Sequence, residues 1–337
     1  MSVALHRSLS KSAVTVLPAT NLPSLCGNAA RIAIVVVLLS AASASLGLAQ
    51  AVEKPRAAAA NPFSFEDPQK FFQQFFGTDT EEDRREIEKV PVSLREEQQV
   101  GSRGVDAYLA ELRRQKIKVV SRGKDVEYLQ QLIAQLRPHM KHRLRYRVIR
   151  VYIAESDKTD ARSFPGGTLI FYRGMLDFVD SEAALVGVIG HELSHIDHGH
   201  QLYDTKRMKL AQDSFRGANG FSPEQFFKSG RLLMRSFMRP FRPEEEAEAD
   251  LDGVRWSYEL GYDPREMAKV FLRMHERDRD ERNVPAFFRT HPYHIDRYRA
   301  AIDEFEKLQK ERPRETLYVG KLNLKRRIPR SKREFAE

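Results

Sequence analysis

The sequence predicts an α+β domain that is predominantly helical, with a small β-sheet beside one central helix. Three observations lead to this prediction. Apolar residues recur with helical spacing through most of residues 93–310. Two neighbouring stretches, residues 144–156 and 168–172, instead alternate as strands do. With 337 residues, the chain is long enough to bury a substantial core without disulfide bonds.

The amino-terminal region differs in composition from the rest of the chain. Arg31 precedes the run "IAIVVVLLSAASASLGLAQA", which ends in small residues. This pattern predicts a secretory signal peptide over residues 1–51, cut near Ala51, and export to the periplasm or cell envelope. The alternative is a membrane anchor formed by residues 32–50. Cleavage would remove Cys26, the only cysteine, so the mature chain would have no disulfide and no thiolate metal ligand.

Residues 52–92 are predicted to form a linker followed by a phenylalanine-rich amphipathic segment. Four phenylalanines make a stripe at helical spacing, at positions 71, 72, 75 and 76. The stripe is typical of a segment that docks on its own domain, and contact with a membrane surface or an envelope protein is the alternative.

Residues 93–311 are predicted to form the main domain. The expected helices cover residues 93–114, 125–140, 181–200, 243–260, 264–279 and 293–310. A Pro-Gly-Gly turn precedes the strand at 168–172. The last segment, 312–337, is strongly basic, and we expect a solvated tail there. Attraction to anionic lipid or a cell-wall polymer is the alternative, whereas export argues against a nucleic-acid partner.

The stretch "VIGHELSHIDHGH" holds four of the ten histidines of the chain. Within it, His191, Glu192 and His195 form the motif H-E-x-x-H. Two histidines four residues apart project from one face of a helix and can chelate a single ion. Glu192 lies next to that pair, where it can take a proton from an attacking water. This arrangement is the one that a zinc hydrolase requires.

The third metal ligand must be a histidine or an acid, because the mature chain lacks cysteine. His198 would lie about 5 Å too far along the helix axis. The pattern H-E-x-x-H-x-x-G-x-x-H fails, because Gln201 stands where its third histidine is needed. An acidic helix about fifty residues downstream can complete a site of two histidines and one carboxylate with an open position. Its candidates are Glu244, Glu245, Glu246, Glu248 and Asp250.

Four segments resemble one known family. The segments "FPGGTLIFYRGML", "VIGHELSHIDHGH", "EEEAEADLDG" and "THPYHIDR" occur in the order seen in the CAAX-prenyl-protease and HtpX-type gluzincins, peptidase family M48. The resemblance covers residues 93–310 and is greatest to the soluble, envelope-located branch. It implies a zincin-type domain that holds one Zn²⁺ per chain, with Glu246 as the third ligand beside His191 and His195.

The resemblance also implies roles for residues around the ion. Glu192 and His291 would be catalytic, His291 by stabilising the tetrahedral intermediate or by capping the zinc in a resting state. Asp250, Arg297 and His200 would support the ligands without binding metal. For the substrate we expect main-chain pairing with the strand 168–172 as a sheet edge, at Gly167, Thr168, Leu169 and Ile170. No role follows for His198, which we expect to be a surface histidine.

These features predict a zinc metalloendopeptidase that cleaves unfolded or misassembled polypeptides outside the cytoplasm. The alternative is a chaperone-like binding protein for quality control, with a closed zinc site and little proteolysis. A Glu192→Gln protein separates the two, because it should retain zinc and lose cleavage.

Overall fold

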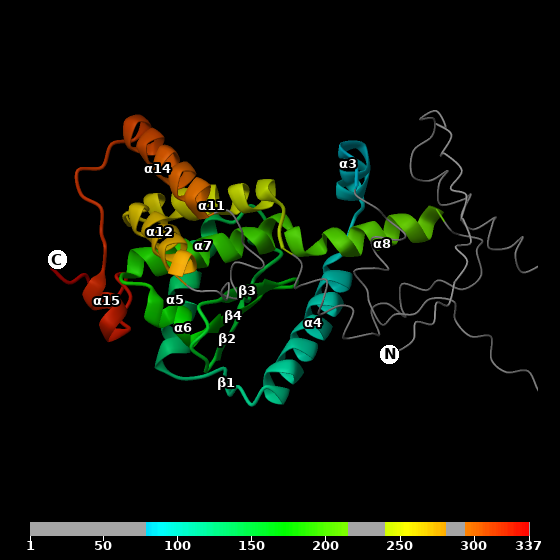
Figure 1. Ribbon diagram of the computed structural model, residues 1–337, viewed down its shortest axis with the longest axis horizontal. Coiled ribbons are helices and arrows are strands. Elements are labelled where there is room, and N and C mark those ends of the chain that lie inside the picture. Colours follow the sequence, from blue (N-terminus) through cyan, green and yellow to red (C-terminus); the bar gives the residue numbers. More distant parts are fainter. Residues whose placement is uncertain (1–78, 215–239, 281–293, 337) are drawn as a thin grey trace, which may run out of the picture. The chain divides into compact units, whose positions relative to one another are not determined.

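The computed structural model describes residues 79–214, 240–280 and 294–336 (Figure 1). The predicted signal segment, the phenylalanine stripe and His291 lie outside these residues. Among the described helices, none is both long enough and apolar enough to cross a membrane.

The predicted fold class is confirmed, because the described residues form many helices and one small four-stranded sheet. The strands are β1 (Val119–Val120), β2 (Arg150–Ala154), β3 (Ala161–Phe164) and β4 (Thr168–Tyr172). The helices are α3 (Glu81–Lys89), α4 (Leu94–Arg114), α5 (Lys124–Leu136), α6 (Arg173–Phe178), α7 (Glu182–His198), α8 (Tyr203–Ser214), α11 (Pro243–Glu259), α12 (Arg265–Asp280), α14 (His294–Glu311) and α15 (Lys321–Arg326), with 3₁₀ turns at Arg137–His139 and His200–Leu202.

Local signals set where the helices begin. The Ser93 hydroxyl caps α4 by accepting from the backbone N–H of Glu96, whose side chain returns the bond to Ser93. The Ser181 hydroxyl caps α7 in the same way by accepting from Ala184. The Thr80–Asp83 capping box starts α3 at the end of the predicted linker and phenylalanine-rich segment, and α3 packs against α8.

The sheet lies between two helical layers and follows the order β1-β2-β4-β3. Because successive side chains of a strand point to opposite faces, β4 contributes side chains to the packing on both faces of the sheet. Leu169 and Phe171 pack in the larger core with α5 and α7, whereas Ile170 and Tyr172 pack with residues of α4. Both faces are therefore buried, and β3 lies beside α7 (Figure 1).

The expectation that residues 168–172 form a sheet edge is wrong. Strand β4 pairs in parallel with β2 on one side and antiparallel with β3 on the other. Its main-chain groups are thus used on both sides, so an extended substrate cannot pair along Thr168, Leu169 and Ile170. The Gly167 carbonyl is used as well, because it accepts a hydrogen bond from the backbone N–H of Arg150. In the described sheet the strands at the two edges are β1 and β3.

Helix α7 is the centre of the core, and α11 crosses it at very short range. Every residue from Glu182 to Asp197 is buried. A Cβ atom placed on Gly190 of α7 would lie 3.0 Å from the Cα of Gly253 on α11. The two backbones touch at this crossing because neither glycine has a side chain, which brings the acidic start of α11 against the histidines of α7.

The carboxyl-terminal segment is packed, which corrects the expected solvated tail. Asn323 is fully buried, and its amide donates to the carbonyls of Ile328 and Arg333. Phe335 is buried as well, and its backbone N–H donates to the Tyr318 hydroxyl. These two anchoring residues hold the segment against the domain. Its strongly basic composition had predicted that it would be solvated.

Candidate metal centre

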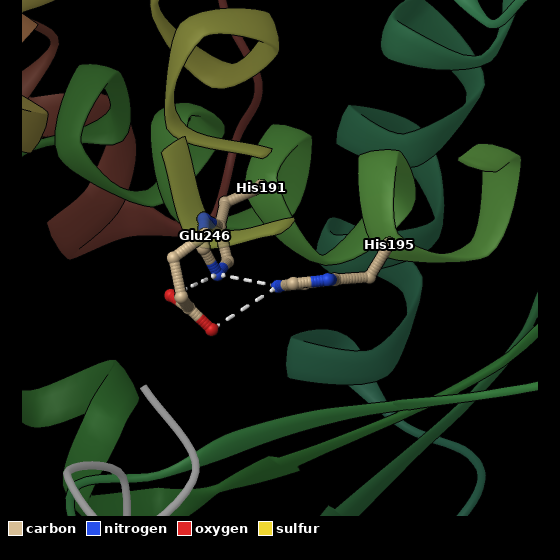
Figure 2. A group of neighbouring side chains, drawn as sticks. All are labelled: His191, His195 and Glu246. Carbon is tan, nitrogen blue, oxygen red and sulfur yellow. Dashed lines mark hydrogen bonds and ion pairs between the residues drawn. The ribbon is translucent and has the colours of Figure 1, made fainter. Parts of the chain in front are cut away.

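The two histidines of the motif point at each other from consecutive turns of α7. Their Nε2 atoms are 3.0 Å apart, and the ring planes are at 84° to each other. Glu246 of α11 faces both rings, with Oε2 3.7 Å from Nε2 of His191 and Oε1 3.6 Å from Nε2 of His195 (Figure 2). The structure thus brings together the three residues expected to bind metal, and all three are buried.

The chemistry of these donors fits a divalent ion such as zinc. Asp250 lies 2.9 Å from Nδ1 of His191, and a carboxylate only accepts, so this imidazole carries its proton on Nδ1. Nε2 of His191 therefore presents a lone pair toward Glu246. Two imidazole nitrogens and one carboxylate at a single point form a donor set that suits zinc.

Arg297 joins two carboxylates of this centre. Its Nε and Nη2 each donate to Asp250 at 2.7 Å, and its Nη1 lies 2.8 Å from Oε2 of Glu246. Burial opposes ionisation of Asp250, but the charges of Arg297 and His191 lower its pKa below the usual value. Burial raises the pKa of Glu246 to about 7, although Arg297 acts in the opposite direction. The guanidinium of Arg297, on α14, thus orients two acids: Asp250, which holds His191, and Glu246, a candidate metal ligand.

Glu192 lies fully buried beside the histidine pair. Burial raises the pKa of Glu192 to about 8, and the nearby Ser163 side chain acts in the opposite direction. Ser163 belongs to β3 and also accepts a hydrogen bond of 2.7 Å from the Gln201 amide. Ser163 was not among the site residues predicted from the sequence. Phe164, the next residue of β3, packs toward α4. Because side chains alternate along a strand, Ser163 must point to the opposite face, toward α7, and this alternation could have identified it.

A second support lies behind His195. Nδ1 of His195 is 2.8 Å from Nδ1 of His200, whose Nε2 lies 3.1 Å from Oε2 of Glu248. This turn is possible because Gly199 ends α7 with a φ of 72°, a left-handed conformation that glycine adopts without strain. The Phe241 ring stacks on His195 with a centroid distance of 3.8 Å. Phe241 was also missed, because it ends a long polar and cationic stretch that shows little apolar periodicity.

Comparisons with known proteins agree with this geometry. The family model described as Peptidase family M48 matches residues 124–304, more than half of the chain. The Beta-barrel assembly-enhancing proteases of Yersinia pestis and of Escherichia coli (strain K12) are each 26% identical to this chain over 151 residues. The matched stretch covers 42% of this chain and 31% of each relative, so it spans about a third of the length of these curated relatives.

Proposed function

The chain belongs to peptidase family M48, a family of metallopeptidases, and from that premise we propose that it is a zinc-dependent endopeptidase with Glu192 as its general base. One observation carries this proposal. His191, His195 and Glu246 converge on one point from two helices, with Glu192 next to the pair in sequence. A metallopeptidase needs this combination of three ligands and an adjacent base.

We assign the chemical roles as follows. His191, His195 and Glu246 would hold the ion, which when bound supplies Lewis-acid polarisation of a carbonyl and of water. Glu192 accepts the proton of the attacking water and returns it to the leaving amine. Ser163 lies near the Glu192 carboxylate and favours its ionised form. Asp250 orients His191 and favours the tautomer in which Nε2 binds metal.

For the substrate we propose an extended polypeptide that pairs with β3. This strand lies beside α7 and has a partner strand on one side in the described sheet. Main-chain pairing requires an unfolded segment, which favours misassembled or unfolded chains over folded ones. The names of the relatives support envelope proteins as the substrate class. Export with cleavage near Ala51 remains part of the proposal, and amino-terminal sequencing of the cell-envelope fraction tests it.

A chaperone-like binding role is the second candidate, and burial of the site favours it. Glu192 and His195 are both 0% exposed, so a peptide bond cannot reach them until the site opens. A protein that rarely opens would bind polypeptides and seldom cut them. The two functions use the same metal centre. They differ in whether the cellular role depends on cleavage of the polypeptide or only on its binding.

The substitution Glu192→Gln distinguishes the peptidase from the binding protein, because it replaces one carboxylate oxygen by an amide nitrogen and leaves the shape of the side chain unchanged. Glu192→Gln in the full chain should retain one zinc ion and lose casein cleavage, and a chelator should abolish cleavage by the wild type. Glu276→Gln, on the exposed face of α12, is the matched control and should cleave normally. Cleavage by Glu192→Gln at the wild-type rate would overturn the role of Glu192. Complementation of a deletion strain by this variant would make binding the principal function.

A further inference from the structure

A second group of potential ligands lies at the carboxyl end of α7, beyond the centre described above. Oε1 of Glu248 is 3.2 Å from Nδ1 of His198, and its Oε2 is 3.1 Å from Nε2 of His200. One potential ligand atom from each of the three residues lies within 4.8 Å of the others. The Glu248 side chain is 50% exposed, so an ion can reach the group from solvent.

The His198 ring is oriented from behind as a metal ligand would be. Its Nε2 lies 2.9 Å from Oδ2 of Asp252, and the same oxygen accepts from the Ser194 hydroxyl at 2.8 Å. A carboxylate that accepts the N–H of one ring nitrogen leaves the other nitrogen to face the ion, as is common around metal-bound histidines. Glu248 and Asp252 are one turn apart on α11, so one helix supplies both a ligand and the group that orients its neighbour.

The electrostatic surroundings favour a cation at this position. The carboxylates of Glu248 and Asp252 contact the two ring nitrogens of His198, one on each side. Lys141 is a cation near Glu248 and opposes a bound ion there. The contact between Nδ1 of His198 and the Glu248 carboxylate therefore needs a positive charge, supplied either by a second ring proton or by a bound ion.

We propose that His198, His200 and Glu248 form a second site for a divalent transition-metal ion, separate from the catalytic one. Two imidazoles and one carboxylate favour ions of the zinc, copper, nickel and cobalt class over calcium or magnesium, which prefer oxygen ligands. This assignment gives a role to His198, and it stands whether or not the proposed peptidase function is correct.

The two sites share a hydrogen bond, and so their occupancy is coupled. Nδ1 of His195 and Nδ1 of His200 are 2.8 Å apart, which leaves room for one proton between them. If both rings bind metal through Nε2 as neutral imidazoles, each needs its own proton on Nδ1. The second ion therefore binds more weakly while the first is in place. Repulsion between two dications acts in the same direction.

Metal counting on the full chain tests the proposal, with Co²⁺ as the probe in equilibrium dialysis. The wild type should bind two ions at saturation, and His198→Ala and Glu248→Gln should each bind one. His275→Ala on α12 is the matched control and should still bind two. His191→Ala should keep one ion, which a further His198→Ala substitution removes. This last result would establish the second site even if the catalytic assignment failed.

Two results would overturn the proposal. One is a wild type that saturates at one ion, if His198→Ala retains that ion. The other is a second ion that both His198→Ala and Glu248→Gln retain, which would place it elsewhere in the chain. The coupling has its own measurement. The ion that remains in His191→Ala should bind at least about fivefold more tightly than the second ion of the wild type, and equal affinities would contradict the coupling.

Discussion

Replacement of Arg297 by methionine removes a cation that pairs with two buried carboxylates of the metal centre. The side chain of Arg297 is 5% exposed, and those of Glu246 and Asp250 are 2% exposed. Methionine has a similar length and no charge, so the change leaves little cavity. What is lost is the pair of hydrogen bonds to Asp250 and the ion pair with Glu246.

The structure sets the size of the effect. Removing one partner of a buried ion pair costs about 3–5 kcal/mol, because the other charge stays buried without compensation. Arg297 compensates two carboxylates, so we expect a loss of about 4–5 kcal/mol in the metal-free protein. With zinc bound, the ion compensates Glu246, and Asp250 still has the His191 N–H. The loss should then fall to about 2 kcal/mol, the cost of the charged hydrogen bonds to Asp250.

Urea unfolding followed by circular dichroism measures both values, once with a chelator and once with zinc. Arg299→Met is the matched control, two positions along α14 with a side chain that is 71% exposed, and should change the free energy of unfolding by less than about 0.5 kcal/mol. A loss below about 1 kcal/mol for metal-free Arg297→Met would refute the reasoning, as would an equal loss with and without zinc.

Three further predictions concern helix packing, pH and the carboxyl-terminal segment. A Cβ on Gly253 would lie 2.9 Å from the carbonyl oxygen of Gly187, so Gly253→Ala should cost about 1–3 kcal/mol and weaken zinc binding, measured by competition with a chelating dye. Lys209 and Ser93 lower the pKa of Glu96 from 4.5 to about 2 by hydrogen bonding, so its contribution is present above pH 4.5 and is lost as pH falls through 2. Glu96→Gln should thus lower the free energy of unfolding at pH 7 by about 0.5 kcal/mol, a value discounted for exposure, and the difference from wild type should disappear below pH 2. Phe335→Ala should cost about 3 kcal/mol in urea unfolding, and a change below about 1 kcal/mol would mean that the segment is not anchored.

Much of the local structure could be predicted from the sequence. Caps and periodicity placed six helices close to their observed bounds, and α7 begins at Glu182 directly after the predicted cap. Four shorter helices among the described residues, α3, α6, α8 and α15, were not predicted. The motif H-E-x-x-H is also local, because helical geometry alone puts His191 and His195 on one face. The strand expected at 144–156 is shorter in the structure, where β2 covers Arg150–Ala154.

The acidic partner of the histidines could not be derived from composition or spacing. Five acids of α11 were candidates, and the choice of Glu246 came from the family resemblance. In the structure the choice depends on how α11 is rotated against α7 where Gly190 meets Gly253. The observed rotation points Glu246 at His191 and His195, and it points Glu248 at His198 and His200. The spacing of acids along α11 does not reveal this rotation.

The sequence by itself determined the helices, their caps and the paired imidazoles, because these depend on residues within a few positions of one another. The tertiary structure decided which strand lies at the sheet edge, which carboxylates face the histidines and whether the basic segment after residue 311 is packed. Those features depend on contacts between segments far apart in the chain, as when Glu182 accepts a hydrogen bond from the backbone of Arg330. Pairing of that kind follows from the shape and polarity of two surfaces together, and neither segment encodes it alone.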